Sequence, residues 1–229
     1  MFALMKLHFI KLIVISIITS ALSFKTTLAK STKLNAIVEK ISDGDTLQVR
    51  LSGSKKTTKV RLLGIDTPET DFNGVSQGKA ALMARDFLRS LVPLKAEVQL
   101  ETYSNREDIH QRLLAVIYFN NTEINLSMLE SGMAFTYFIF PYDKSLQKKY
   151  SLASQIASKE KMGIFADEYQ NLQAPYLFRQ EQKGMEGNMV VASESKRKLF
   201  HQIDILLVDH YDRVFFAIPE QAKERGFSW

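Results

Sequence analysis

The stretch that decides the fold begins with Asp-Gly-Asp-Thr at Asp43–Thr46 and ends with Arg-Leu-Leu-Gly-Ile-Asp-Thr-Pro-Glu at Arg61–Glu69. Between these two motifs, apolar and polar residues alternate over 47–51, the two-residue period of a half-buried strand. A returning strand is expected over 59–65, with a turn at Gly53. Such a hairpin brings both acidic motifs to the same end of a sheet.

Two carboxylates are expected to meet there. Asp45 is in phase with the apolar residues and therefore points toward the mouth of a core, and the returning strand places Asp66 beside it. Adjacent carboxylates repel each other unless a cation or a proton intervenes. Oxygen donors without Cys or His suit a hard cation such as calcium. Because Pro68 restricts Thr67 to extended conformations, the Thr67 carbonyl is a third expected ligand, with Glu69 close to the ion.

Arg61 lies five residues before Asp66 on the same strand and offers a guanidinium fork to phosphate oxygens. The alternative is a hairpin end that carries only solvated charges. Asp-Gly alone favours that alternative because it is an ordinary turn signal. The joint pattern of acidic residues, arginine and Thr-Pro favours a site.

Together these motifs resemble the staphylococcal nuclease (thermonuclease-like) family. The resemblance covers about residues 35–166. Further matches occur in order at Asp108, Arg112, Ala115, Asn125, Gly132 and Gly163-Ile164-Phe165. The family implies calcium-dependent hydrolysis of DNA and RNA, with single strands favoured. It implies cleavage on the 5′-oxygen side that leaves 3′-phosphate ends.

The expected roles follow from chemistry and from this resemblance. Asp45, Asp66 and the Thr67 carbonyl hold Ca²⁺, and Glu69 acts as general base or positions the attacking water. Arg61 and Arg112 stabilise charge on the phosphoryl oxygens.

Three of these expectations have structural alternatives. Arg112 opens a strand, and its alternative role is a structural ion pair with Asp108. His110 stands where relatives carry an aromatic residue of a Lys-Tyr-Gly turn, so stacking on a base is open. Tyr137 is a second candidate for substrate contact, and its alternative is an aromatic residue packed in the barrel.

The remaining pattern predicts an α+β fold that is mainly β. Strands are expected over 96–100 and 112–118, and an extended segment over 135–140. Helices are expected over 80–91, 123–131 and 146–157. Five strands with three helices in this order predict an OB-fold barrel over residues 30–166, followed by a C-terminal extension over 167–229.

Residues 1–29 have the pattern of a secretory signal peptide. Lys6 and Lys11 precede an apolar run that begins at Leu12, and small residues follow. The run is short for a membrane span, although an uncleaved anchor is the alternative. Export predicts a secreted or periplasmic monomer, and without cysteine its stability must come from packing.

The extension carries no recognised motif. Residues 170–197 are polar and predict a linker or an irregular wrap, and 200–208 with 214–218 predict a hairpin. Asp204, Asp209, His210 and Asp212 fit a solvated turn better than a second metal site.

The net charge of +5 includes three lysines in the first 29 residues, so it says little about partners. The rival function is a nucleic-acid-binding or interaction module of the same fold with weak or no catalysis. That rival predicts gaps among the charged site residues, and none of them is missing here.

Overall fold

The computed structural model describes residues 31–103, 107–184 and 189–229. The predicted signal peptide or anchor at 1–29 lies outside these residues. Within them, no helix combines the length and the apolar character that crossing a membrane requires.

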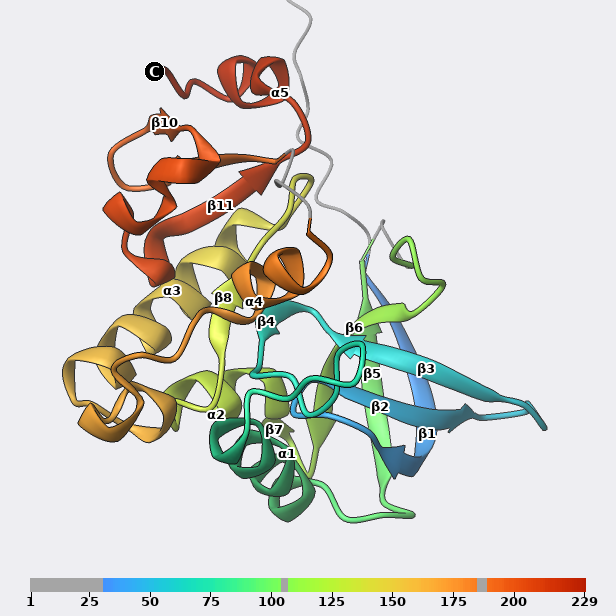
Figure 1. Cartoon of the computed structure of the whole chain (residues 1–229). Coiled ribbons are helices and arrows are strands. Elements are labelled where there is room, and N and C mark those ends of the chain that lie inside the picture. Colours follow the sequence, from blue (N-terminus) through green and yellow to red (C-terminus); the bar gives the residue numbers. More distant parts are fainter. Residues whose placement is uncertain (1–30, 104–106, 185–188) are drawn as a thin grey trace, which may run out of the picture.

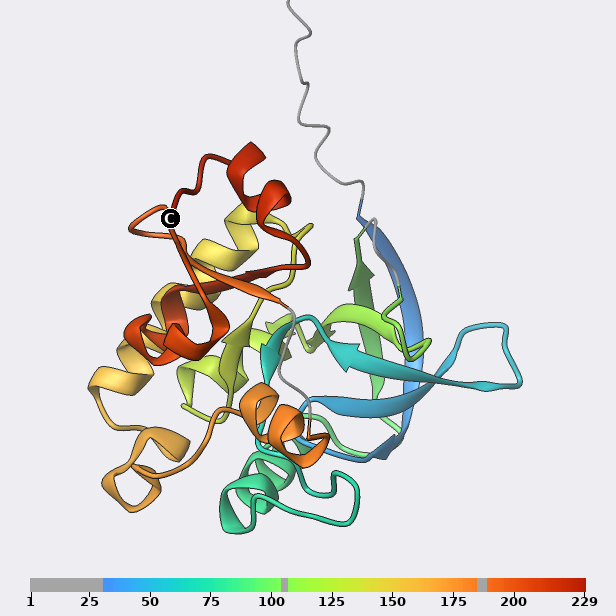
Figure 2. The same cartoon turned by 45° about the horizontal axis from the view of Figure 1, so that its top comes forward.

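Five strands form a closed barrel (Figures 1 and 2). They are β1 (Thr32–Ile41), β2 (Thr46–Leu51), β3 (Thr57–Leu62), β5 (Glu97–Thr102) and β6 (Leu113–Phe119). Their order is β3-β2-β1-β5-β6, and a parallel pairing of β3 with β6 closes the ring. The short β7 (Thr122–Glu123) pairs with β6. The predicted OB-fold barrel is confirmed.

The alternation of residues along these strands fills the barrel. Val38 on β1 lies opposite Val49 on β2, and Leu47 lies opposite Val60 on β3. All four side chains are buried, as expected for inward-facing positions of a small barrel. The polar residues between them face outward.

The predicted returning strand divides at Leu63. The next residue, Gly64, has a φ of +79° and begins β4 (Gly64–Asp66), which pairs with β8 (Phe135–Tyr137). A Cβ at this position would lie 2.6 Å from the ring of Phe138, so the turn requires glycine in two ways. The turn leads from the barrel strand β3 into β4, whose last residue is Asp66.

Asn125 fixes this turn from behind. It lies at the start of α2 (Ile124–Glu130), where its Oδ1 accepts from the Ile117 N–H at 3.0 Å. Its Nδ2 donates to the carbonyls of Leu63 at 3.0 Å and Ala115 at 3.2 Å. One buried side chain therefore ties β6 to the segment that leads into β4.

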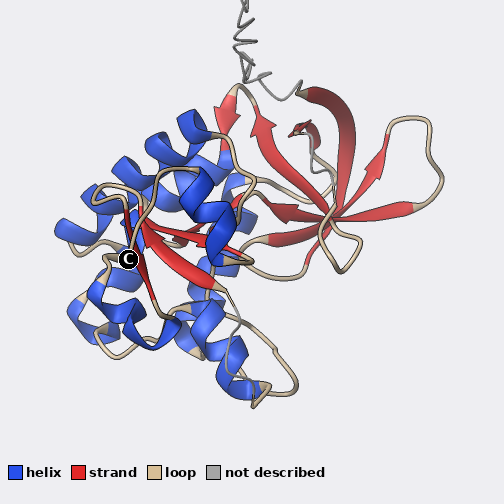
Figure 3. Cartoon of the chain, turned by 90° about the horizontal axis from the view of Figure 1, so that it is seen from above, coloured by secondary structure: helices blue, strands red, loops and turns tan. Residues whose placement is uncertain are grey.

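The helices gather on one side of the barrel (Figure 3). Besides α2, they include α1 (Lys79–Leu91) and α3 (Lys144–Lys159), all three close to their predicted bounds. Asp143 caps α3 by accepting from the Leu146 N–H at 2.7 Å.

The C-terminal extension is more regular than its sequence suggests. It contains α4 (Pro175–Gln182), α5 (Pro219–Glu224) and a small sheet of β9 (Val190–Ser193), β10 (Lys198–Phe200) and β11 (Arg213–Phe216). Short 3₁₀ turns are η1 (Gly163–Phe165), η2 (Asp167–Tyr169), η3 (Gln202–Leu207) and η4 (His210–Asp212).

Two predictions for the extension are therefore wrong. Residues 170–197 are not an irregular wrap, since they contain α4 and β9. Residues 200–208 and 214–218 do not form a hairpin, because most of the first segment is a 3₁₀ turn. The β9 strand pairs with both β10 and β11 and forms the centre of the sheet. Its four residues are all buried, so they lack the alternation that marks a half-buried strand.

The extension shares a core with the barrel domain. Phe135 and Ile164 pack with Tyr176, Ile205 and Phe215 of the extension. Backbone hydrogen bonds join the two parts as well, from the Phe215 N–H to the Phe138 carbonyl at 2.8 Å. The extension is consequently docked on the β4–β8 side of the barrel, next to Asp66.

His210 belongs to this shared core and does not lie in a solvated turn. Its ring stacks on Phe165 at 4.6 Å, and burial with the nearby Arg213 lowers its pKa to about 4. Asp212 accepts from the Ser195 N–H at 2.8 Å. In the part of the chain that the structure describes, no three Asp, Glu or His side chains converge as a metal centre.

Candidate active site

Asp45 and Asp66 meet at the end of the barrel, as the hairpin predicts. Nη2 of Arg61 lies 3.1 Å from Asp45 Oδ2 and 2.7 Å from Asp66 Oδ1, so one nitrogen joins both carboxylates. Asp66 is fully buried and Asp45 is 5% exposed. Buried carboxylates require paired positive charge, and this arrangement supplies it.

Asp45 also clamps the second motif. Its Oδ2 accepts from the Thr67 N–H at 2.8 Å, and its Oδ1 accepts from the Thr46 hydroxyl at 2.9 Å. A Cβ at Gly44 would lie 2.8 Å from Thr67 Oγ1, so the first motif needs glycine where the second packs on it.

Arg61 is more constrained than a free phosphate-binding fork. Its Nη1 donates to the carbonyls of Leu62 at 3.0 Å and Ile65 at 2.7 Å, and its side chain is 8% exposed. Both Nη atoms are therefore engaged by the protein. Arg61 supports the β3–β4 turn and neutralises the aspartates at the same time.

Glu69 begins the loop that leads to α1. Its N–H donates to Gln77 Oε1 at 3.0 Å, and its carbonyl accepts from the Gln77 N–H at 2.9 Å. Burial and the neighbouring Asp45 raise the pKa of Glu69, against the opposing effect of Arg179. A carboxylate with a raised pKa is a better proton acceptor near neutral pH.

Asp43 was not assigned a role from the sequence, although it belongs to the quoted motif. Burial, with the charges of Asp45 and Glu69, raises its pKa to about 8. Its Oδ1 accepts from the Gly44 N–H at 2.8 Å. The sequence signal for Asp43 was its position two residues before Asp45 in the same motif.

Sequence reasoning missed Arg179, which lies on α4 of the extension. Its Nη1 and Nη2 pair with Asp66 Oδ1 at 2.9 Å and Oδ2 at 3.0 Å. The same Nη1 lies 2.5 Å from Glu69 Oε1. Pro175 at the helix start and Gly184 just past its end are signals for the helix, but not for where it docks.

Arg112 and His110 are both held by Asp108. Arg112 Nε donates to Asp108 Oδ2 at 2.7 Å, which is the ion pair of the structural alternative. It precedes β6, where Leu114 lies beside Arg61 in the parallel pairing. His110 is exposed, and its N–H donates to Asp108 Oδ1 at 2.9 Å. Although burial opposes it, these bonds lower the pKa of Asp108.

Tyr137 lies next to the site and is partly buried. Its ring stacks on Tyr176 of α4 at 5.6 Å and tilts against Phe215 at 5.1 Å. The Arg179 guanidinium lies 5.9 Å from its centre. This environment favours the packing alternative for Tyr137.

Comparison with known proteins assigns the family. A model of staphylococcal nuclease homologues matches residues 59–167. An uncharacterized endonuclease of Haemophilus influenzae is 32% identical over 169 residues, which cover 73% of this chain and 86% of that protein. The chain belongs to the staphylococcal nuclease family.

Two further relatives differ in length. Endonuclease YhcR of Bacillus subtilis is 28% identical over 201 residues, which cover 83% of this chain but only 16% of YhcR. Thermonuclease of Staphylococcus intermedius is 28% identical over 124 residues, 54% of this chain and 69% of that protein. A continuous match to 83% of this chain includes residues 40–190 wherever it begins, so the likeness to YhcR extends over α4.

The residues of this nuclease-family site fit a hard cation by their chemistry. Asp45, Asp66 and the carbonyl of Thr67 offer only oxygen donors. Thr67 Oγ1 is a buried oxygen for which the described residues provide no hydrogen-bond partner. Two carboxylates are few for calcium, so substrate oxygens and water would complete the coordination.

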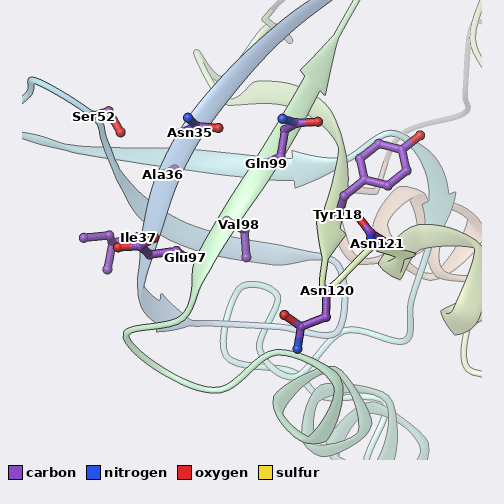
Figure 4. A pocket seen from close by; sticks show the side chains of 10 residues that line it. All are labelled: Asn35, Ala36, Ile37, Ser52, Glu97, Val98, Gln99, Tyr118, Asn120 and Asn121. Atoms are coloured by element: carbon purple, nitrogen blue, oxygen red, sulfur yellow. The ribbon is translucent and has the colours of Figure 1, made fainter.

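A separate hollow lies on the outer wall of the barrel (Figure 4). Side chains of β1, β5 and β6 with their flanks line it, among them Asn35, Gln99, Tyr118 and Asn120. None of the predicted site residues reaches it, so the chemistry lies elsewhere.

Proposed function

We propose that this protein is a calcium-dependent nuclease that hydrolyses phosphodiester bonds of DNA and RNA, with single strands preferred. In this proposal the bond on the 5′-oxygen side breaks and 3′-phosphate ends remain. The observation that carries it is the convergence of Asp45, Asp66, Glu69 and Arg61 at one end of the barrel. Relatives named endonuclease and thermonuclease support it.

Asp45, Asp66 and the Thr67 carbonyl would hold the cation. When bound, Ca²⁺ supplies Lewis-acid polarisation of a phosphoryl oxygen. Glu69 takes a proton from the attacking water, a role that its raised pKa supports. Arg61 holds both aspartates in register through Nη2 and through its bonds to the β3–β4 turn.

Arg112 is the proposed contact to the phosphoryl group. Its side chain is 27% exposed while it pairs with Asp108, just before β6. The exposed His110 in the same loop is a proposed contact to a base. For Tyr137 the ring contacts with Tyr176 and Phe215 favour packing over substrate contact.

We further propose that the protein acts as a monomer outside the cytoplasm, in the periplasm or the medium. The apolar run with flanking lysines in residues 1–29 supports export. Mass spectrometry of the exported protein tests this point: an N-terminus still at Met1 favours an anchored enzyme.

Digestion of single-stranded DNA and RNA oligonucleotides with a 5′ label tests the function. The full chain is incubated with Ca²⁺ or with a chelator, and mass spectrometry identifies the product ends. Cleavage only with Ca²⁺, to 3′-phosphate ends, is expected. Ends with a 3′-hydroxyl contradict the proposed bond. Tight binding without any cleavage supports the binding module instead.

A further inference from the structure

Arg179 reaches the site from outside the matched family region. The family model ends at residue 167, and α4 begins at Pro175. In Figures 1 and 2, α4 (orange) lies against the barrel domain beside β4. The ion pairs from Arg179 to Asp66 and Glu69 join positions 113 and 110 residues apart.

The helix is held in place from two sides. On the barrel side, Gln77 Nε2 donates to the Gln173 carbonyl at 2.7 Å, just before α4. Tyr176, one turn before Arg179, stacks on Tyr137. On the extension side, Tyr176 accepts a hydrogen bond from Arg213, and Gln180 accepts one from Gln202. Arg179 is therefore positioned by a packed element.

Arg179 uses the oxygens that a cation needs. A carboxylate offers about four lone-pair sites. Asp66 Oδ1 accepts from Arg61 and Arg179, and Oδ2 accepts from Arg179. One lone-pair site of the Asp66 carboxylate is therefore left for a cation. Asp45 Oδ2 is engaged by the Thr67 N–H and by Arg61, and Oδ1 accepts from the Thr46 hydroxyl. The Asp45 carboxylate therefore also keeps one lone-pair site.

The positive charge of Arg179 also opposes binding of a cation at Asp66. A guanidinium and a divalent cation that bind the same carboxylate repel each other. At such a short distance the repulsion is significant even where the dielectric constant is high. The centre of the Tyr137 ring lies 5.9 Å from the guanidinium, so Arg179 can make a cation–π contact with this ring when it leaves Asp66.

We propose that Arg179 is an active-site residue that competes with the cation for Asp66. Without a cation, its guanidinium balances Asp66 and Glu69. For the cation to coordinate Asp66 fully, Arg179 has to leave that carboxylate. Helix α4 thereby sets the calcium affinity of the site. This inference rests on the proposed function, since it takes Asp66 as a cation ligand.

Calorimetric titration of the full chain with CaCl₂ tests the inference without reference to activity. Arg179→Met removes the competing charge, so Ca²⁺ is expected to bind about tenfold tighter or more. The matched control is Lys183→Met at the end of the same helix. Lys183 is exposed and lies over the Phe72 ring, and no ion pair joins it to Asp66 or Glu69 in the described residues, so its removal is expected to change affinity less than about twofold.

Arg179→Lys is the second variant, chosen in case the methionine variant does not fold. It keeps the charge but cannot span both oxygens of Asp66, so a smaller gain in affinity of a few fold is expected. Circular dichroism checks that each variant is folded.

Two results overturn the inference in distinguishable ways. If the wild type binds Ca²⁺, Asp45→Ala abolishes that binding and neither Arg179 variant tightens it, the competition is wrong while the cation site stands. If no protein in the series binds Ca²⁺, the proposed function fails together with the inference.

Discussion

Asn125→Ala removes the side chain that ties β6 to the turn before β4. The change leaves the buried Ile117 N–H and the partly buried Leu63 carbonyl without their partner. The Ala115 carbonyl keeps the Leu63 N–H as a donor at 2.9 Å, so two groups are orphaned rather than three.

Each buried unsatisfied group costs about 1–3 kcal/mol, so the free energy of unfolding is expected to fall by about 2–6 kcal/mol. That is a large share of the roughly 5–15 kcal/mol typical of a native protein.

Urea unfolding followed by circular dichroism measures this loss. Glu130→Ala is the matched control because Glu130 is an exposed residue of the same helix, and a change within about 0.5 kcal/mol is expected. A loss below about 1 kcal/mol for Asn125→Ala, with an unchanged dependence on urea, would refute the reasoning that Asn125 holds the turn.

Three further predictions concern the carboxylates and their arginine. Glu69→Gln keeps the shape of the side chain but not its basicity, so single-turnover cleavage is expected to slow by about 10²–10⁴ with little change in calorimetric Ca²⁺ affinity. Arg61→Lys loses the fork that joins two carboxylates and two carbonyls, so both urea stability and cleavage rate are expected to fall. The pKa of Asp43 is raised to about 8 in the folded protein, so its stabilising contribution is complete below pH 4 and is lost as pH rises through about 8. In Ca²⁺-free buffer, Asp43→Asn is expected to remove the part of this loss that falls between pH 5 and about 8, about 1.4 kcal/mol for each pH unit, when urea unfolding is compared at pH 5 and pH 9.

A different result would contradict each of these three predictions. Full activity in Glu69→Gln removes the assignment of the base. Unchanged stability in Arg61→Lys shows that its contacts to the turn are replaceable. If the wild type and Asp43→Asn lose stability in parallel from pH 5 to pH 9, the titrating group is another residue.

The barrel and the aspartate pair were predictable because their signals are local. Alternation over 47–51 sets which face is buried, and a hairpin is the shortest route from Asp45 to Asp66. The break at Gly64 is harder to predict from the sequence. Its glycine is required by the approach of Phe138, a residue 74 positions later in the chain.

The contact of Arg179 is not predictable from local pattern. Its helix of eight residues has start and stop signals, but docking depends on Tyr176 meeting Tyr137 and on the shared core with Phe215. The β9 strand was missed for a related reason. A strand buried on both faces shows a short apolar run, which periodicity alone does not distinguish from other buried segments.

The most direct test of the central claim is the cleavage rate of a single-stranded DNA oligonucleotide at increasing Ca²⁺, for the wild type and Asp45→Ala side by side. The account predicts that the wild type cleaves with a saturable dependence on Ca²⁺, and that Asp45→Ala stays folded but does not cleave at any concentration. Equal cleavage by both proteins, or wild-type cleavage that persists in a chelator, would contradict it.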